Sequence, residues 1–226
     1  MNFSLQQIPL NRRHCIVLAG ILAASGIYGP TGAATVPTEP ATPSLLVLGD
    51  SLSAEYGLRR GTGWVALLER QLEAEKMKVT VVNASISGDT TSGGRARLPA
   101  LLAQHRPTLV VIELGGNDAL RGLPLDMSRD NLLSMTRLAQ QSGAKVALLG
   151  MQVPPNYGRD YAQRFARIYV DVAKATRSAL VPFFLKGIAD VPDSMAWFQA
   201  DRIHPKEEAH PRLLANVWPT LKKGLQ

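Results

Sequence analysis

Short apolar segments alternate with longer amphipathic segments along most of the chain. Apolar runs of strand length occupy residues 45–49, 78–85, 108–115, 144–152 and 180–184. These runs are almost uninterrupted instead of alternating between apolar and polar positions, which is typical of strands that are buried on both faces. The pattern therefore predicts a parallel sheet of five strands that is covered on both sides.

Segments with helical spacing lie between the predicted strands. The first of them places Val65, Leu68 and Leu72 on one face, and the predicted helices cover residues 63–76, 91–105, 128–143, 158–179 and the tail from Pro211. Alternating strands and helices form right-handed parallel crossovers, so we expect an α/β fold built as a three-layer α/β/α sandwich. A flavodoxin-like strand order, 2-1-3-4-5, would make the first three strands neighbours.

The first 34 residues differ from the rest of the chain. Arg12 and Arg13 precede an apolar run at 15–29, and small residues follow as far as Ala34. This order predicts a secretory signal peptide that is cleaved near Ala34, and hence a periplasmic or secreted protein. A membrane anchor is the alternative, but the run is shorter than the roughly 20 residues of a spanning helix. We therefore expect no stable membrane span.

Composition and charge narrow the remaining possibilities. Residues 35–44 contain three prolines and predict a linker, which leaves 45–226 as one domain. The only cysteine, Cys15, lies in the predicted signal peptide, so a cysteine nucleophile and a disulfide are both excluded from the mature chain. The net charge is +7, but the basic residues are scattered and only 6% of residues are aromatic. This composition does not favour nucleic acid as a partner.

Unusual residues follow the first three predicted strands. The loops that leave these strands contain Gly49-Asp50-Ser51, SISGDT at 85–90 and GGND at 115–118. In open parallel sheets, ligands bind beyond the carboxyl ends of the strands, so these loops should form one crevice. Ser51 is a candidate nucleophile there. Because serine is a weak nucleophile, it needs a base, and the base needs an orienting group.

One histidine has the surroundings that such a base requires. Asp201 precedes His204 by three residues and Pro205 follows it. Within one tight turn, that carboxylate can reach the inner ring nitrogen of His204, which leaves the outer nitrogen for Ser51. The other histidines have simpler explanations: one leaves with the signal peptide, one ends a predicted helix, and one is expected to face solvent at the start of the last helix (His14, His105 and His210).

A tetrahedral oxyanion also needs hydrogen-bond donors that point toward it. The backbone N–H groups of Ser51 and Gly88 and the side-chain amide of Asn117 are the available candidates. Taken singly, each residue has another interpretation. Asp50 or Ser51 could cap a helix, and Gly88 and Asn117 could be turn residues. The Asp201–His204 pair could lie on the surface or form a poor metal site with Glu208.

The four motifs together, in this order, resemble the SGNH (GDSL-type) hydrolases over residues 45–218. The stretches NASISGDTTSGGRARLPALL, ELGGNDALRGLP and PPNYG resemble the bacterial multifunctional esterase branch, which includes acyl-CoA thioesterases, lysophospholipases and arylesterases. The resemblance implies a flavodoxin-like fold, a Ser-His-Asp triad, no metal and no other cofactor. It also implies broad hydrolysis of acyl esters and thioesters in the periplasm or outside the cell.

We therefore predict a monomeric serine hydrolase that acts on small acyl esters and thioesters, including lipid-derived ones. A carbohydrate O-deacetylase with the same site, or a non-catalytic binding module, is the alternative. Leu120, Leu123 and Leu125 follow the GGND block on a predicted loop, 119–127, where they have no helix face to occupy. We expect them to line a groove for the acyl chain, the alternative being that they pack under the loop as core.

Overall fold

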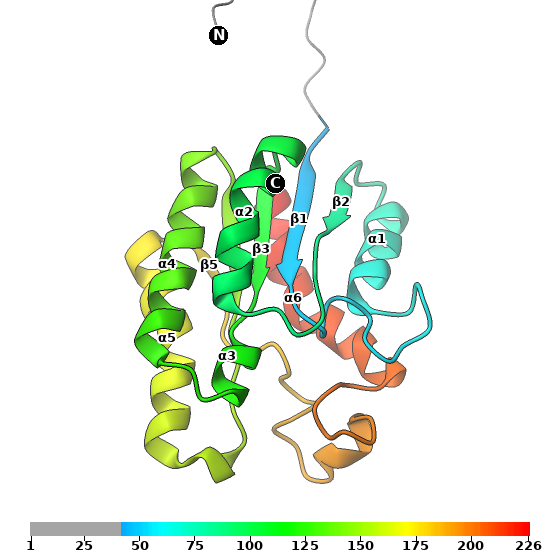
Figure 1. Cartoon of the computed structure of the whole chain (residues 1–226). Coiled ribbons are helices and arrows are strands. Elements are labelled where there is room, and N and C mark those ends of the chain that lie inside the picture. Colours follow the sequence, from blue (N-terminus) through cyan, green and yellow to red (C-terminus); the bar gives the residue numbers. More distant parts are fainter. Residues whose placement is uncertain (1–41) are drawn as a thin grey trace, which may run out of the picture. The chain divides into compact units, whose positions relative to one another are not determined.

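Five parallel strands form the central sheet of the computed structural model, which describes residues 42–226. The spatial order β2-β1-β3-β4-β5 confirms the predicted flavodoxin-like arrangement (Figure 1). Both faces of the central strands are buried, which explains their unbroken apolar sequences. The bounds are β1 (Ser44–Gly49), β2 (Thr80–Asn83), β3 (Leu109–Glu113), β4 (Lys145–Leu149) and β5 (Ala179–Val181).

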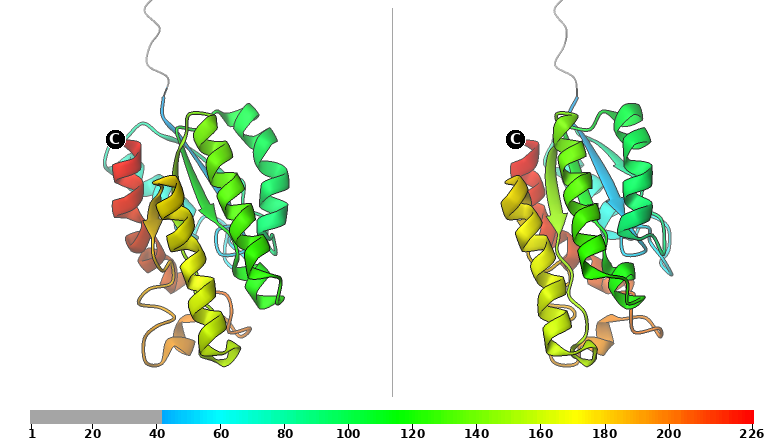
Figure 2. Two further views of the ribbon diagram at one scale, coloured as in Figure 1. Left: turned by 90° about the vertical axis from the view of Figure 1, so that its left-hand side faces the viewer. Right: turned by 60° about the vertical axis from the view of Figure 1, so that its left-hand side comes forward.

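Helices cover both faces of the sheet, as the sequence predicts. The three helices α2, α4 and α5 lie side by side on one face, and α1 and α6 lie together on the other (Figure 2). The bounds are α1 (Trp64–Ala74), α2 (Thr91–His105), α3 (Gly116–Leu120), α4 (Leu125–Gln141), α5 (Arg159–Thr176) and α6 (His210–Leu225). Short 3-10 turns add η1 (Pro155–Tyr157), η2 (Ser194–Trp197) and η3 (Glu207–Ala209).

The segment after the GGND block is more regular than predicted. The predicted loop at 119–127 is wrong at both ends, because α3 ends at Leu120 and α4 already begins at Leu125. Pro124 directly precedes α4, and its fixed φ of −57° suits the entry to a helix. Leu125 then becomes the first member of a buried stripe at helical spacing, which continues through Ser128, Leu132, Met135 and Ala139.

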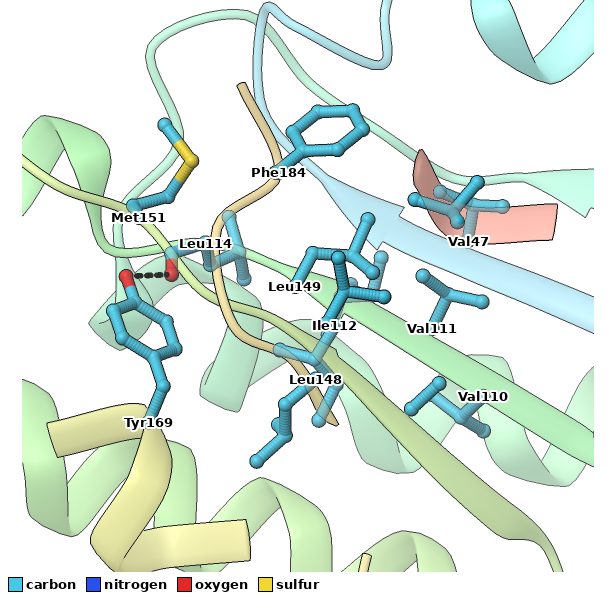
Figure 3. Packing of buried hydrophobic residues seen from close by; sticks show 14 of the residues in the cluster. Val47, Val110, Val111, Ile112, Leu114, Leu148, Leu149, Met151, Tyr169 and Phe184 are labelled. Carbon is cyan, nitrogen blue, oxygen red and sulfur yellow. Dashed lines mark hydrogen bonds between the residues drawn. The ribbon is translucent and has the colours of Figure 1, made fainter. Parts of the chain in front are cut away.

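Aliphatic side chains from the strands fill the space between the layers. Val111, Ile112 and Leu148 are completely buried, and Tyr169 of α5 packs beside them with its hydroxyl donating to the Leu114 carbonyl at 2.9 Å (Figure 3). Burying each such side chain stabilises the fold by about 1.5–3 kcal/mol. The core therefore gives a rigid base to the loops that leave the carboxyl ends of the strands.

The described residues start shortly before β1. The predicted signal peptide, 1–34, and most of the predicted linker, 35–44, lie outside them, and Ser44 is the first residue of β1. Within residues 42–226, no helix is both long and apolar enough to cross a membrane.

Candidate active site

The loop after β1 brings Ser51 to the edge of the sheet. The Asp50 carbonyl accepts hydrogen bonds from the backbone N–H groups of Ser53 and Ala54, and the Asp50 carboxylate accepts one from Leu52 at 3.0 Å. Asp50 thus closes a tight turn around Ser51 through both its backbone and its side chain. The turn buries most of Ser51, which lines a pocket at this edge.

His204 and Asp201 meet Ser51 from a loop about 150 residues later in the sequence. The Nε2 atom of His204 lies 2.8 Å from the Ser51 Oγ, and Nδ1 lies 2.6 Å from an Asp201 carboxylate oxygen. The other Asp201 oxygen accepts the backbone N–H groups of Ile203 and His204 at 2.9 and 3.0 Å. The structure therefore brings together the three residues that the sequence predicts as nucleophile, base and orienting acid.

The environment of Asp201 favours its charged form. Burial opposes ionisation, but the hydrogen bonds from the His204 ring and from the backbone of His204 and Ile203 outweigh it, and the pKa of Asp201 falls to about 2. Asp201 is therefore a carboxylate at neutral pH. As a hydrogen-bond acceptor, this carboxylate favours the tautomer of His204 that carries a proton on Nδ1. In the neutral ring, Nε2 is then free to accept the proton of Ser51.

Tyr56 is a neighbour of His204 that was not among the predicted site residues. The two ring centroids lie 4.3 Å apart with planes inclined by 38°, although half of the Tyr56 surface is exposed. The Tyr56 backbone is fixed at both ends, since its N–H donates to the Ser51 carbonyl and its carbonyl accepts from the Gln199 side chain. Tyr56 follows Ser51 by five residues, but no local spacing rule connects it with His204.

The predicted oxyanion donors lie on three adjacent loops. Asn117 and Ser51 line the pocket with His204, and one N–H of the Asn117 amide donates to the Asp50 carboxylate at 3.0 Å. Gly88 has a left-handed φ of +78° and does not line the pocket, and its carbonyl accepts a hydrogen bond from Arg121 at 3.0 Å. Within the described part of the chain, the backbone N–H groups of Ser51 and Gly88 have no acceptor.

The last residue of the GGND block is structural. Asp118 is completely buried, and its carboxylate accepts hydrogen bonds from the backbone and hydroxyl of Thr91 and from the hydroxyl of Ser128. It therefore ties α3 to the first residue of α2 and to α4. This anchor fixes the start of α3, where Asn117 stands.

Two buried acidic side chains lie directly behind Ser51. Burial raises the pKa of Asp50 to about 6, against hydrogen bonds from Leu52 and Asn117 that lower it. Glu113, the last residue of β3, is completely buried, and burial together with the Asp50 charge raises its pKa well above the usual range. Glu113 was not among the predicted site residues, although it is the only charged residue in the apolar run 108–115.

The pocket in front of Ser51 has a volume of about 500 Å³. Its walls carry many apolar side chains, including Leu120, Val153, Phe183, Leu185, Phe198 and Ile203. Of the three leucines predicted to form an acyl groove, only Leu120 lines it. Leu123 is half-buried outside the lining, and Leu125 packs into the core because α4 begins at that residue.

His210 does not face solvent, contrary to the prediction. Only 2% of its surface is exposed, and its Nδ1 accepts the backbone N–H of Trp64 at 3.0 Å. Trp64 begins α1, and the preceding Gly63 has no side chain to cap that helix, so His210 takes the place of the cap. Among residues 42–226, no cluster of three or more His, Cys, Asp or Glu side chains could hold a metal ion.

Comparison with known proteins identifies the family. The model of the GDSL-like Lipase/Acylhydrolase family matches residues 47–212. Esterase TesA of Pseudomonas aeruginosa strain PAO1 is 57% identical over 184 residues, which are 81% of this chain and 90% of that protein. A protein of Escherichia coli strain K12 named thioesterase 1/protease 1/lysophospholipase L1 is 43% identical over 171 residues, which are 76% of this chain and 79% of that protein.

A solved structure of similar architecture is the psychrotrophic esterase EstA from Pseudoalteromonas sp., inhibited by monoethylphosphonate. It superposes with a TM-score of 0.74 at 40% identity, covering 80% of this chain and 97% of that protein. The fold, the matched segment and these similarities agree with one another. The chain belongs to the GDSL-like lipase/acylhydrolase family, a family of serine hydrolases that act on esters.

Proposed function

We propose that this protein hydrolyses carboxylic esters and thioesters through an acyl-enzyme intermediate on Ser51. The observation that carries the proposal is the continuous contact from Ser51 through His204 to Asp201, with distances of 2.8 and 2.6 Å. It is located beside a pocket with many apolar side chains, which suits an acyl chain. The relatives named esterase and thioesterase support both classes of substrate.

The reaction proceeds in two halves. The Ser51 oxygen attacks the acyl carbonyl carbon while His204 takes the hydroxyl proton, and the oxyanion is stabilised by the N–H groups of Ser51 and Gly88 and by the Asn117 amide. The tetrahedral intermediate collapses, and His204 gives the proton to the departing alcohol or thiol. Water then attacks the acyl-enzyme, with His204 again taking a proton, and returns Ser51 and a free carboxylic acid.

The acyl chain lies along the apolar wall that includes Leu120, Val153 and Phe198. These side chains offer no polar partners, so chain length is sensed mainly through the apolar area that is buried. Each buried methylene is worth about 0.8 kcal/mol, so kcat/KM should rise roughly fourfold per carbon until the wall is covered. An O-deacetylase acting on sugars would show no such rise.

Replacement of Ser51 by alanine tests the mechanism. We expect Ser51→Ala to abolish turnover of p-nitrophenyl esters, acyl-CoA thioesters and lysophospholipids while leaving the circular dichroism spectrum and the melting temperature unchanged. A serine-directed phosphonate should modify the wild-type protein at Ser51 and leave the variant unmodified, as read by peptide mass spectrometry.

Ser142→Ala is the matched control, because Ser142 is an exposed residue at the end of α4, and its hydroxyl donates to the Ala139 carbonyl of the same helix. It should retain full activity and full labelling. Ester turnover by Ser51→Ala at the wild-type rate would refute the mechanism. Turnover of acetylated sugars alone would instead favour a deacetylase, and no reaction with either substrate or phosphonate would favour a binding module.

The protein acts as an exported monomer in this proposal. Export rests on the basic, apolar and small-residue segments of residues 1–34. Cleavage near Ala34 leaves intact every element from β1 to α6, since β1 begins at Ser44.

A further inference from the structure

Glu113 occupies an unusual position, since it is a fully buried acidic residue beneath the nucleophile loop. It ends β3 directly opposite Gly49, the last residue of β1. A Cβ atom on Gly49 would approach a Glu113 carboxyl oxygen and the Ser53 hydroxyl to within 2.9 and 2.8 Å, so glycine is needed at that position. The local backbone is therefore shaped to admit this carboxyl group.

The two oxygens of Glu113 have different surroundings. Oε2 accepts hydrogen bonds from the Ser53 hydroxyl at 2.8 Å and from the backbone N–H of Asp50 at 3.3 Å. The Ser53 hydroxyl in turn accepts the indole N–H of Trp64 at 3.1 Å, so its own proton points to Glu113. Oε1 is buried and receives no hydrogen bond from any donor in residues 42–226. Oε2 thus has the partners of a carbonyl oxygen, and Oε1 is the place for a proton.

Asp50 is the neighbour that can accept this proton in a hydrogen bond. The Asp50 backbone N–H donates to Glu113 Oε2 at 3.3 Å, and the charge of Asp50 raises the pKa of Glu113, so the two carboxyl groups are close neighbours. Two buried carboxyl groups this close do not both ionise, so one of them keeps a proton. Asp50 accepts the backbone N–H of Leu52 and an N–H of Asn117, both of which favour its charged form. Glu113 also accepts two hydrogen bonds, but both fall on Oε2; burial of the whole side chain together with the Asp50 charge outweighs them and disfavours its ionisation. The pair therefore carries one negative charge, on Asp50.

Asn117 connects the Asp50 carboxylate with the predicted oxyanion site. A primary amide has two N–H groups, and one of them donates to Asp50 at 3.0 Å. This bond fixes the rotation of the amide and leaves its second N–H to donate to the substrate. A chain of contacts thus runs from Glu113 to Asp50 and on to Asn117.

We propose that Glu113 is a positioning residue for the oxyanion donor: as a neutral carboxylic acid it donates to the Asp50 carboxylate, which in turn holds the Asn117 amide in place. The inference rests on the proposed function and adds a residue that touches neither the substrate nor Ser51. The proposed role needs a neutral hydrogen-bond donor at position 113, and this donor does not have to be a carboxylic acid. Glutamine should therefore replace Glu113, and an apolar residue should not.

A double-mutant cycle between positions 113 and 117 tests the inference with a p-nitrophenyl ester as substrate. Asn117→Ala should lower kcat about 10²- to 10³-fold, the usual loss for one oxyanion donor. Glu113→Leu should lower kcat at least tenfold with little change in KM, and Glu113→Gln should stay within threefold of the wild type. In the Glu113→Leu background, the factor by which Asn117→Ala lowers kcat should be at least tenfold smaller than in the wild type.

Two measurements keep the test decisive if Glu113→Leu folds poorly. Thr136→Val, which removes a buried hydroxyl that donates to the Leu132 carbonyl within α4, serves as the control for general loss of buried polar contacts. Infrared spectroscopy at neutral pH should show a protonated-carboxyl C=O band in the wild type that is absent from Glu113→Gln. Strictly multiplicative losses in the cycle, or no such band, would overturn the inference. Absence of wild-type ester turnover and of phosphonate labelling would instead refute the proposed function.

Discussion

Leu120 and Leu125 are only five residues apart, yet they belong to different parts of the molecule. Leu120 ends α3, is 39% exposed and lines the pocket, whereas Leu125 begins α4 and is buried in the core. Residue type and local composition are the same for both, so they could not separate the two roles. The deciding factor is the residue at which α4 begins, because that sets which positions join its buried stripe.

This difference predicts opposite effects of truncation. Leu120→Ala should lower kcat/KM for esters of eight to twelve carbons severalfold, because it removes apolar wall, and it should leave acetate esters and the melting temperature nearly unchanged. Leu125→Ala should cost about 2–5 kcal/mol of unfolding free energy, the usual range for a cavity in a core, without changing the preference among chain lengths. Initial rates from two to twelve carbons and thermal melts of both variants measure this. An equal fall on all substrates for Leu120→Ala would place the acyl chain elsewhere.

The predicted catalytic residues show which features of the site can be inferred from the sequence and which cannot. Ser51, Asp201 and His204 could be predicted because a tight three-residue spacing and a strand-end serine are local patterns. Tyr56 and Glu113 could not be connected to them in the same way. The contact of Tyr56 with His204 and that of Glu113 with Asp50 depend on how distant segments come together.

At the scale of elements, the N-terminus of α1 depends on the N-terminus of α6. The first N–H of α1, on Trp64, donates to His210, which is the first residue of α6. The two helices share one face of the sheet, and this contact joins their ends. The sequence predicted both helices with boundaries close to those observed, but it could not identify the side chain that caps α1. That partner lies 146 residues away.

The cap predicts a pH dependence of stability. Burial lowers the pKa of His210 to about 4 from its usual 6.5, so the unfolded chain binds more protons than the folded one between these values. The contribution of neutral His210 to the free energy of unfolding is complete above pH 6.5 and is lost as the pH falls toward 4. Its maximum is roughly 3 kcal/mol. Urea unfolding at pH 7.5 and pH 5 should therefore show a larger decrease for the wild type than for His210→Asn.

The comparison isolates His210 because both proteins share every other titrating group. Asparagine keeps an acceptor near the position of Nδ1 but cannot take up a proton in this range. The variant should be less stable than the wild type at pH 7.5, since it loses part of the buried ring. Equal pH dependence in the two proteins would contradict a neutral, buried His210.

At the scale of the whole molecule, the order of the parallel strands explains why the loops of the site could be predicted from the sequence. The order β2-β1-β3 makes neighbours of the three loops that carry Gly88, Ser51 and Asn117. The chain then completes α4, β4, α5 and β5 before the segment from β5 to α6 returns to the same edge (Figure 1). That segment carries Asp201 and His204, and His204 contacts Ser51. The flavodoxin-like order is one of the common orders of parallel α/β sheets and is implied by the family resemblance, whereas the path of the segment from β5 to α6 has no periodic pattern. Its turns, η2 and η3, were accordingly not predicted.

If the protein is exported and cleaved as proposed, the mature chain differs from the full-length chain in mass and in cysteine content. Cleavage near Ala34 would give a protein that begins near Thr35 and contains no cysteine, because Cys15 is the only one in the sequence. Material isolated from the periplasm or medium should have an intact mass that corresponds to this start and should gain nothing on treatment with iodoacetamide. The full-length chain, expressed without processing, should gain one alkyl group after denaturation and serves as the positive control.

The melting temperature of the mature form should not respond to a reducing agent. The fold is stabilised by the apolar core of its sheet and helices, and a mature chain without cysteine has no disulfide. Exported protein that retains residues 1–34 and reacts with iodoacetamide would show that the segment is an anchor instead of a cleaved signal.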